Sequence, residues 1–533
     1  MIRRRHDVDR VFSLSLLAAL DTTDGVDETL ELSEPVETGD TIVVERRSTL
    51  WERAWLELRT VDGGLEIHTC VEGRGDLTQV SLLGGRSALG NGAPLGPTWS
   101  GTELPQLFSP SPEDGLAPIR PIAAGATVGV IGEGEPGRGR WLFSPAPLYW
   151  AFGDGASSLW YDLGVVSPIE ELRFAEVALD AYAKGFVVRL DYDGRTRVNG
   201  EFRAPVLLLR RDVGDPWQGL RRHRDDLVAR GASPAPAARE TPDWWRRPIF
   251  CGWGAECHLE ATQGGLARDY ATQANYDMFL AQLDEHGVVP GTIVLDDKWQ
   301  ATYGRNEPDT GKWPDLHGWI ADRHAAGQKV LLWWKAWDAE GLPEELCVRN
   351  TDGAAVGLDA SNPAALEELR RIVRTMLIDL DADGFKVDFT ARTPSGCNLQ
   401  AADGTWGIAA LHTLLKAFYG AAKDAKPDAL VITHTPHPAF VDVTDMIRLN
   451  DVIGGVPLVE QMQFRADVVR AACPELPIDS DDWRVPNKRE WREFLAVKRE
   501  IGVPSLYYAS HIDATGEELD DDDYAALREV FSA

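Results

Sequence analysis

The sequence predicts two fold classes in one chain: an N-terminal antiparallel β-sandwich followed by a (β/α)8 barrel. Short alternating strands with glycine-rich turns recur up to about residue 235. From about Trp244 onward, strands alternate instead with amphipathic helices. A chain of 533 residues exceeds what one hydrophobic core usually covers, so two or more domains are expected.

The first domain is predicted to span residues 1–235. Runs such as 41–45, 65–68 and 186–190 alternate apolar and polar residues, as half-buried strands do. Turns of the Asp-Gly type separate them, for example at 62–64 and 193–194. Regularly spaced strands of this kind are typical of a large sandwich, and no catalytic constellation is apparent in them.

The N-terminus offers two interpretations. Arg3–Arg5 followed by an apolar run resembles a short signal peptide, but Asp7 and Asp9 interrupt the basic region and no small-x-small cleavage site follows. We therefore interpret Val11–Ala19 as the first strand. A cytoplasmic location is expected, with secretion as the alternative.

Composition narrows the possible partners. A net charge of −30 argues against a nucleic-acid partner, whose phosphates would be repelled. No apolar run reaches the ~18 residues of a membrane span. The six cysteines form no CxxC pair, so neither a zinc ribbon nor a disulfide scaffold is indicated.

Nineteen tryptophans exceed what packing tends to need, and indole faces are platforms for sugars. A small-molecule or oligosaccharide substrate is therefore expected; the oligomeric state is not predicted.

A Pro/Ala-rich linker at 236–243 precedes the predicted barrel of residues 244–533. Helical patterns lie between most of its strands, for example at 276–285, 366–378 and 407–425. The eight candidate strands are 249–253, 292–295, 330–334, 384–388, 429–433, 446–450, 476–479 and 504–508.

Polar and aromatic residues follow six consecutive strands. Catalytic residues of such barrels project from the C-terminal strand ends, so these side chains should form one polar cup rimmed by tryptophan. A cup of this kind fits a sugar, whose hydroxyl groups need donors and acceptors and whose C–H face stacks on aromatic rings. The residues are Asp296, Asp297, Trp299, Trp333, Trp334, Lys335, Lys386, Asp388, His434, His437, Arg448, Asp451, Asp479, Asp481 and Asp482.

The segment Gly384-Phe-Lys-Val-Asp-Phe389 is the most informative of these strand ends. Side chains alternate along a strand, so Lys386 and Asp388 share one face and Val387 takes the other. A buried charged pair is costly unless its members serve each other or a ligand. A salt-bridged pair without a catalytic role is the alternative on this segment alone.

The ordered series CGWG, LDDKWQ, KWPDL, VLLWWKAW, GFKVDF and IDSDDW resembles glycoside hydrolase family 36 and its clan relatives, which include the α-galactosidases. The resemblance implies retaining α-glycoside chemistry by two carboxylates. It implies that Asp388 is the nucleophile, that Lys386 beside it binds a hydroxyl and keeps Asp388 ionised, and that Asp451 of an Arg-x-x-Asp pattern is the acid/base. Asp296 and Asp297 match the double aspartate that binds hydroxyls at the far side of the sugar.

Two departures from the family pattern affect specificity. The DDGW turn of the α-galactosidases is DDKW here, with Lys298 in place of glycine. On strand 5 a cysteine- or glycine-rich segment is replaced by Thr433-His-Thr-Pro-His437, where the sugar's 2-position is usually read. We therefore expect weak activity on simple α-galactosides, and a steeper acid limb of the pH profile from histidines that titrate near their ordinary pKa of ~6.5.

The predicted catalytic residues are Asp388 and Asp451, with Asp481 and Asp482 as competing carboxylates for the acid/base role. Two histidines with a carboxylate could alternatively bind a metal, but no metal and no cofactor is predicted. A transglycosylase and a catalytically silent sugar-binding protein are the alternative functions. The predicted substrate-binding residues are Asp296, Asp297, Trp253, Trp299, Trp333, Trp334, Lys335, Lys386, His434, His437, Arg448, Asp481 and Asp482.

Overall fold

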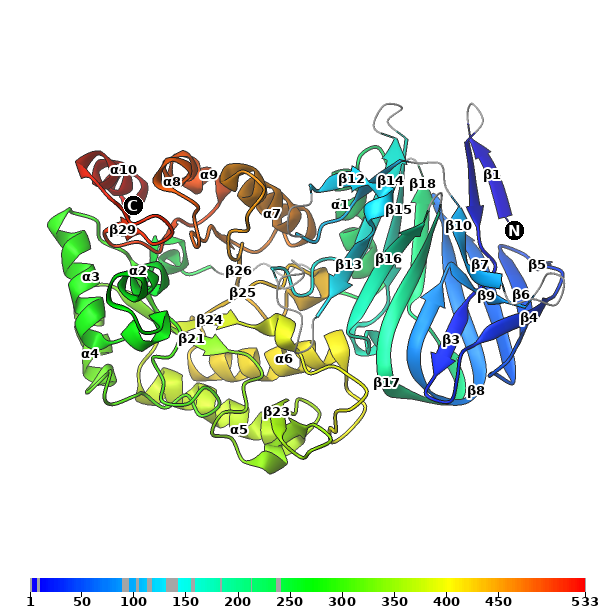
Figure 1. The fold of residues 1–533 in the computed structure, drawn as a ribbon, viewed down its shortest axis with the longest axis horizontal. Helices are drawn as coiled ribbons and strands as arrows, with labels where there is room; N and C mark the ends of the chain where they lie inside the picture. The colour runs from blue at the N-terminus through cyan, green and yellow to red at the C-terminus, as the bar shows by residue number, and fades with distance from the viewer. Residues whose placement is uncertain are drawn as a thin grey trace.

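A computed structural model gives the fold, and it describes residues 2–6, 10–88, 95–101, 105–112, 117–130, 142–154, 159–182, 185–211, 213–235 and 241–532. An antiparallel β domain lies on one side of the molecule and the barrel on the other (Figure 1). Both predicted fold classes are confirmed. Of the predicted linker, residues 236–240 lie outside the described residues, and the domain limits remain a prediction.

The β domain forms one hydrogen-bonded network of strands around two long members, β8 and β17. These two pair antiparallel from Val188↔Leu82 to Arg203↔Cys70. The other edge of β8 pairs with β7 and β3, so this strand joins separate parts of the domain. The strands are β1 (Ile2–His6), β2 (Arg10–Leu14), β3 (Ala19–Thr22), β4 (Glu28–Leu32), β5 (Val36–Thr38), β6 (Thr41–Ser48), β7 (Arg53–Val61), β8 (Gly64–Leu82), β9 (Gly84–Ser87), β10 (Leu95–Gly101), β11 (Gln106–Phe108), β12 (Ile119–Pro121), β13 (Ala126–Gly129), β14 (Tyr149–Asp154), β15 (Leu159–Val166), β16 (Glu176–Tyr182), β17 (Gly185–Arg203) and β18 (Val206–Arg211).

The predicted first strand, Val11–Ala19, is shorter than expected. Strand β2 ends at Leu14, and β3 begins only at Ala19. The intervening residues have no regular structure, although Leu16, Leu17 and Ala18 are buried. Their apolar character therefore reflects core packing rather than strand pairing.

Eight parallel strands form the barrel, in the spatial order β27-β26-β25-β24-β21-β20-β19-β28. The ring closes between β27 and the segment before β28, where the Val503 N–H donates to the Ile478 carbonyl at 2.7 Å and the Ser480 N–H donates to the Val503 carbonyl at 3.0 Å. All eight predicted strands are present. They are β19 (Ile249–Cys251), β20 (Thr292–Leu295), β21 (Lys329–Lys335), β24 (Gly384–Asp388), β25 (Leu430–Thr433), β26 (Met446–Arg448), β27 (Ile478–Asp479) and β28 (Ser505–Leu506).

Helices cover the barrel, and two small hairpins, β22–β23 and β29–β30, extend its loops. Of the described residues, no helix combines the length and apolarity needed to cross a membrane. The helices and hairpin strands are α1 (Pro216–Ala229), α2 (Trp253–Gln263), α3 (Gln273–Glu285), α4 (Leu316–Ala325), α5 (Pro363–Arg374), α6 (Gly407–Ala425), α7 (Leu458–Ala472), α8 (Lys488–Leu495), α9 (Lys498–Ile501), α10 (Asp521–Phe531), β22 (Cys347–Arg349), β23 (Ala355–Leu358), β29 (His511–Ile512) and β30 (Glu517–Glu518); short helices are η1 (Ile122–Ala124), η2 (Ile169–Glu171), η3 (Asp243–Arg246), η4 (Ala267–Tyr270), η5 (Glu344–Leu346), η6 (Thr375–Asp379), η7 (Thr390–Arg392) and η8 (Pro438–Phe440).

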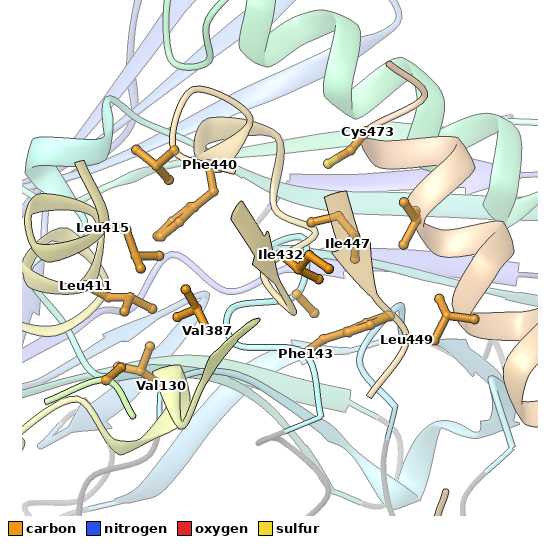
Figure 2. Packing of buried hydrophobic residues seen from close by; sticks show 14 of the residues in the cluster. Val130, Phe143, Val387, Leu411, Leu415, Ile432, Phe440, Ile447, Leu449 and Cys473 are labelled. Carbon is orange, nitrogen blue, oxygen red and sulfur yellow. The ribbon is translucent and has the colours of Figure 1, made fainter. Parts of the chain in front are cut away.

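The β domain and the barrel share a continuous hydrophobic core. Phe143 and Val130 of the β domain belong to the same packed cluster as Val387 and Leu449 of the barrel (Figure 2). Burying such side chains on both partners stabilises the contact, at roughly 1.5–3 kcal/mol for each large apolar side chain. The β domain is therefore fixed against the strands that carry the predicted site.

Candidate active site

The C-terminal ends of the barrel strands turn sharply. Of the nine non-glycine residues at positive φ in the described part of the chain, five follow a barrel strand within three residues. Such left-handed conformations are unfavourable for most side chains and concentrate at functional sites. The five are Lys298, Trp337, Phe389, Asn450 and Asp481. Lys298 has a φ of 68°, the conformation that the glycine of the DDGW turn would adopt without strain.

The pleat of β21 and β24 decides which side chains reach the barrel interior. Trp333 donates its indole N–H to Oδ2 of Asp388 at 3.2 Å, so both point inward. Trp334, one residue on, stacks against Phe418 of α6 with ring centroids 4.2 Å apart. The structure therefore does not bring Trp334 to the predicted cup, because its ring packs against helix α6 outside the barrel.

One guanidinium joins three carboxyl groups. Arg448, which is 1% exposed, places Nη2 3.0 Å from Oδ1 of Asp388 and Nη1 3.2 Å from Oδ1 of Asp451. Nη1 also lies 2.8 Å from Oδ2 of Asp481. The two predicted catalytic carboxyl groups therefore lie on adjacent nitrogens of one planar group. Their side chains are 23% and 24% exposed, whereas Asp481 is fully buried.

The same surroundings shift the pKa values of the pair in opposite directions. Burial alone would raise the pKa of Asp388, but the Arg448 guanidinium and, to a lesser extent, Lys386 lower it below its ordinary value. Burial raises the pKa of Asp451 to about 7, and the nearby Asp481 and Asp388 add to this effect against the attraction of Arg448. Near neutral pH, Asp388 is therefore ionised while Asp451 is partly protonated.

Lys386 has a different partner from the one predicted. Its Nζ lies 2.6 Å from Oδ2 of Asp296 and 3.6 Å from Sγ of Cys251. The thiol of Cys251 donates to the same aspartate oxygen at 2.9 Å. Lys386 and Asp388 do share the inner face, but no direct bond joins them. The ammonium of Lys386 instead holds the first aspartate of the DDKW segment.

The second aspartate, Asp297, is bound by a residue that sequence reasoning missed. The Tyr303 hydroxyl donates to Oδ1 of Asp297 at 2.7 Å. Lys335 and Lys298 lie on the tyrosine ring, with Nζ 4.1 Å and 3.9 Å from its centroid, and pair with Asp338 and Glu340. Burial raises the pKa of Asp297 to about 6 against the Tyr303 hydrogen bond.

Of the two predicted histidines, only His434 lies near the carboxylates. Its Nδ1 is 4.0 Å from Oδ1 of Asp388, and its Nε2 is 2.7 Å from the Thr390 hydroxyl. His437 instead accepts from the Ala439 N–H through Nδ1 at 3.1 Å and caps η8. The structure therefore does not bring His437 to the carboxylate cluster, because its ring caps η8 and packs near Phe440.

Burial lowers the pKa of both histidines to about 3. With these pKa values, neither ring titrates near pH 6.5 as expected, and both are neutral at that pH because burial disfavours their charged form. Among the residues that the structure describes, no group of three or more His, Cys, Asp and Glu side chains could hold a metal ion.

Asp482 is not part of the cluster either. It is fully buried, its Oδ1 lies 2.7 Å from Nζ of Lys498, and the Trp491 indole donates to its Oδ2 at 3.3 Å. The structure therefore does not bring Asp482 to the carboxylate cluster, because this carboxylate is paired with the buried Lys498. Asp481, the other competitor, keeps a lowered pKa: burial would raise it, but Arg448 dominates.

The remaining predicted tryptophans, Trp299 and Trp253, make no hydrogen bond to Asp388. Trp299 is fully buried and donates its indole N–H to the Trp333 carbonyl at 2.8 Å. Trp253 is half-buried, with its ring 5.8 Å from that of Trp483. Trp333 is therefore the tryptophan that contacts a predicted catalytic group.

Tyr507 and Cys251 were also missed, although the strand-end criterion could have found them. Tyr507 follows β28, and its ring lies 5.0 Å from Nζ of Lys386. Cys251 ends β19. Tyr303 carries no such signal, because it belongs to an irregular loop.

Comparison with known proteins supports the fold. No family model and no curated protein matches the sequence. Solved structures do match. An α-galactosidase from Thermus thermophilus, in complex with stachyose, aligns with a TM-score of 0.55 at 15% identity over 93% of this chain and 98% of that one. A GH31 family sulfoquinovosidase from E. rectale, in complex with an aza-sugar inhibitor, gives 0.62 at 12% identity over 100% and 82%. A cycloalternan-degrading enzyme from Trueperella pyogenes gives 0.54 at 12% over 98% and 80%.

The chain thus has the fold of multidomain glycosidases in which a β domain accompanies a (β/α)8 barrel. The neighbours include both an α-galactosidase and a family 31 enzyme. The fold therefore agrees with the clan-level resemblance in the sequence and does not distinguish family 36 from family 31.

Proposed function

We propose that the protein is a retaining α-glycosidase in which Asp388 is the nucleophile and Asp451 the acid/base. The observation that carries the proposal is a pair of partly exposed carboxyl groups on one guanidinium, one with a lowered pKa and the other with a pKa raised to about 7. Retaining glycosidases need this division, because one group attacks as an anion while the other delivers a proton. The named neighbours support the proposal through their shared fold.

The reaction proceeds in two displacements. First, the Asp388 carboxylate attacks the anomeric carbon, the bond to the leaving oxygen breaks, and Asp451 donates its proton to that oxygen. Then Asp451, now ionised, takes a proton from water as the water oxygen attacks the anomeric carbon and frees Asp388. Both groups return to their initial states. A sugar hydroxyl in place of water would give transglycosylation by the same steps.

Arg448 suits this chemistry because it contacts both groups. When Asp388 forms the glycosyl ester it loses its negative charge, and Asp451 gains one as it gives up its proton. The total charge around the guanidinium is the same before and after this step. A fixed cation between the two groups therefore stabilises the transfer without reorganising, as preorganised electrostatic sites do.

Asp296, Asp297 and Lys386 are proposed to bind sugar hydroxyl groups. Asp296 and Lys386 form a desolvated ion pair beside the catalytic cluster, offering an acceptor and a donor at fixed positions. Trp333 orients the nucleophile through its indole N–H. These groups do not change protonation state in the proposed reaction.

A two-stage experiment tests the proposal. Hydrolysis is first measured on p-nitrophenyl α-galactoside, α-N-acetylgalactosaminide, α-glucoside and α-arabinopyranoside, and the best substrate is then followed by proton NMR. If the mechanism is retaining, we expect the α-anomer of the sugar to appear first, before mutarotation. Initial release of the β-anomer would overturn the retaining mechanism, and no release from any α-glycoside would argue against glycosidase activity.

A further inference from the structure

The loop that carries Asp451 is held by side chains rather than by regular structure. It runs from the end of β26 to the start of α7. The guanidinium of Arg465, on α7, donates through Nη1 to the carbonyls of Leu449, Asn450 and Asp451, each at 2.8 Å. Arg465 is fully buried. Buried backbone groups outside a ladder need such partners, and here one charged donor serves three consecutive carbonyls.

A second residue of α7 continues this support. Gln461 lies one helical turn before Arg465, and its Oε1 accepts from Arg465 Nη2 at 3.2 Å. The same carboxamide accepts from the Ile453 N–H at 3.0 Å and donates to the Ile453 and Val456 carbonyls at 3.0 and 3.1 Å. The face of α7 thus contacts the loop backbone on both sides of Asp451.

Asn450 holds the loop from the opposite side. Its Oδ1 accepts from the Asp451 N–H at 2.9 Å, and its Nδ2 donates to the Leu142 carbonyl of the β domain at 2.8 Å. Its backbone has a φ of 68°, which asparagine tolerates better than most residues. Phe143, next to Leu142, is packed against the barrel in the cluster of Figure 2, and the Ser144 N–H donates to the His434 carbonyl at 3.0 Å.

We infer that Asn450 is a positioning residue for Asp451, and that Arg465 and the Leu142 carbonyl complete a clamp on the acid/base loop. The inference rests on the proposed acid/base role of Asp451. A general acid works only within hydrogen-bond reach of the leaving oxygen, and a misplacement of about 1 Å can cost on the order of 100-fold in rate. On this account the β domain helps to position the acid/base through the Leu142 carbonyl.

Two substitutions separate the bonds that Asn450 makes. Asn450→Asp keeps the shape and the acceptor for the Asp451 N–H, but once ionised the new carboxyl cannot donate to the Leu142 carbonyl. Asn450→Gly tolerates the positive φ and removes both bonds. We expect kcat/KM to fall about 10–100-fold for an alkyl or phenyl glycoside and less than about 3-fold for the dinitrophenyl glycoside, which needs little protonation.

The pH dependence gives a readout that a merely structural role would not move. When protonated, the new carboxyl of Asn450→Asp still donates to the Leu142 carbonyl, so its loss relative to wild type should grow as pH rises. The loss in Asn450→Gly should not show this dependence. If Asn450→Gly fails to fold, as circular dichroism would reveal, the pH series on Asn450→Asp decides the question alone.

Asn306→Asp is the matched control. Asn306 is also buried at positive φ and donates to the Tyr303 carbonyl at 2.7 Å, but its loop follows β20. Any loss in this variant should be equal for both leaving groups. In an Asp451→Ala background, adding Asn450→Asp should lower kcat/KM by less than about 2-fold, because the effect of Asn450 depends on Asp451.

The outcomes distinguish the two hypotheses. Equal losses for both leaving groups in Asp451→Ala would remove the acid/base role and with it the inference. A leaving-group-dependent loss in Asp451→Ala, together with equal losses for both leaving groups in the Asn450 variants, would overturn the positioning role alone. If Asn450→Asp lowers kcat/KM as much in the Asp451→Ala background as in wild type, the positioning role of Asn450 would be overturned as well.

Discussion

Two buried cations lie at the strand ends of this barrel, and they differ in how many carboxyl groups they hold. Lys386 pairs with one carboxylate, Asp296. Arg448 contacts three, Asp388, Asp451 and Asp481. Both cations are almost fully buried, so the difference lies in the local charge balance.

The difference suits the two proposed roles, sugar binding at the Lys386 pair and chemistry at the Arg448 cluster. The lysine and its aspartate form a neutral pair, so neither needs to exchange a proton. Around Arg448, one positive charge faces three acids, and a low-dielectric site disfavours ionising all of them. Burial and the neighbouring Asp481 and Asp388 raise the pKa of Asp451 to about 7, so near neutral pH this acid is partly protonated, whereas Arg448 lowers the pKa values of Asp388 and Asp481. The excess of acids over cations thus contributes to the raised pKa that the proposed general-acid role of Asp451 requires.

Removing the nucleophile should have the largest effect. Asp388→Asn or Asp388→Ala should lower kcat by at least about three orders of magnitude, because no other group in the proposal attacks the anomeric carbon. Azide should restore turnover of the alanine variant and give a β-glycosyl azide, detectable by NMR. A circular dichroism spectrum like that of wild type would verify that the fold is intact. Near-normal rates in Asp388→Asn would contradict the assignment of Asp388 as the nucleophile.

Removing the acid/base should depend on the leaving group. Asp451→Asn should lower kcat/KM about 100- to 10,000-fold for alkyl glycosides and far less for aryl glycosides that leave without protonation. Asp482→Asn is the matched control, since this carboxylate pairs with Lys498 outside the cluster. If the leaving-group dependence appeared in Asp482→Asn and not in Asp451→Asn, the roles would have to be reassigned.

Breaking the ion pair between Asp296 and Lys386 should weaken both substrate binding and the stability of the fold. Asp296→Asn leaves Lys386 as an uncompensated buried charge, which should cost about 3–5 kcal/mol of unfolding free energy. It should also cost about 1–3 kcal/mol of transition-state binding, and less for a substrate lacking the hydroxyl held there.

Asp482→Asn again supplies the comparison, because it breaks another buried lysine pair and should lower stability in denaturant unfolding without this substrate dependence. Equal kinetic losses for the intact and deoxygenated substrates in Asp296→Asn would show a purely structural aspartate.

The pH profile should reflect the different pKa values of Asp388 and Asp451, which both contact Arg448. The protonated fraction of Asp451 falls as pH rises through about 7, so kcat/KM should decrease on the basic side. Asp388 has a lowered pKa and stays ionised into the acid range, so the acid limb that reports Asp388 should lie well below pH 6, below the titration of Asp297 near 6. Asp451→Asn should lose the basic limb. An acid limb near pH 6.5 that disappears in His434→Ala would contradict the buried neutral state of that ring.

The smallest expected effect concerns the sugar itself. His434 lies 4.0 Å from the Asp388 carboxylate, and the family resemblance implies that this strand segment contacts the sugar's 2-position. We therefore predict weak hydrolysis of melibiose compared with a glycoside that has other ring substituents. His434→Ala should change this preference, and His437→Ala should not, because His437 caps η8. Efficient melibiose hydrolysis unaffected by His434→Ala would remove the specificity role.

Much of the barrel could be predicted because strand periodicity and strand-end chemistry are local. That Lys386 and Asp388 share one face of their strand follows from alternation alone. The same rule places adjacent tryptophans on opposite faces, so the outward direction of Trp334 was available from the sequence. Cys251 and Tyr507 could likewise have been found at the ends of β19 and β28.

The rest depends on contacts between distant segments. The pairing of Lys386 with Asp296 and of Asp482 with Lys498 is set by how strands and helices meet in space. The direction of His437 depends on the turn after β25, and its neutral state depends on burial. Neither is encoded in the spacing of residues along a strand.

The central claim is that Asp388 becomes covalently attached to the sugar. A fluorinated glycosyl fluoride of the preferred sugar, which forms the glycosyl-enzyme faster than it is released, would trap that intermediate for peptide mass spectrometry. The account predicts one added glycosyl group per chain, located on Asp388, and slow recovery of activity as it is released. A label on another carboxylate, or complete turnover through an intermediate that leaves Asp388 unmodified, would contradict it.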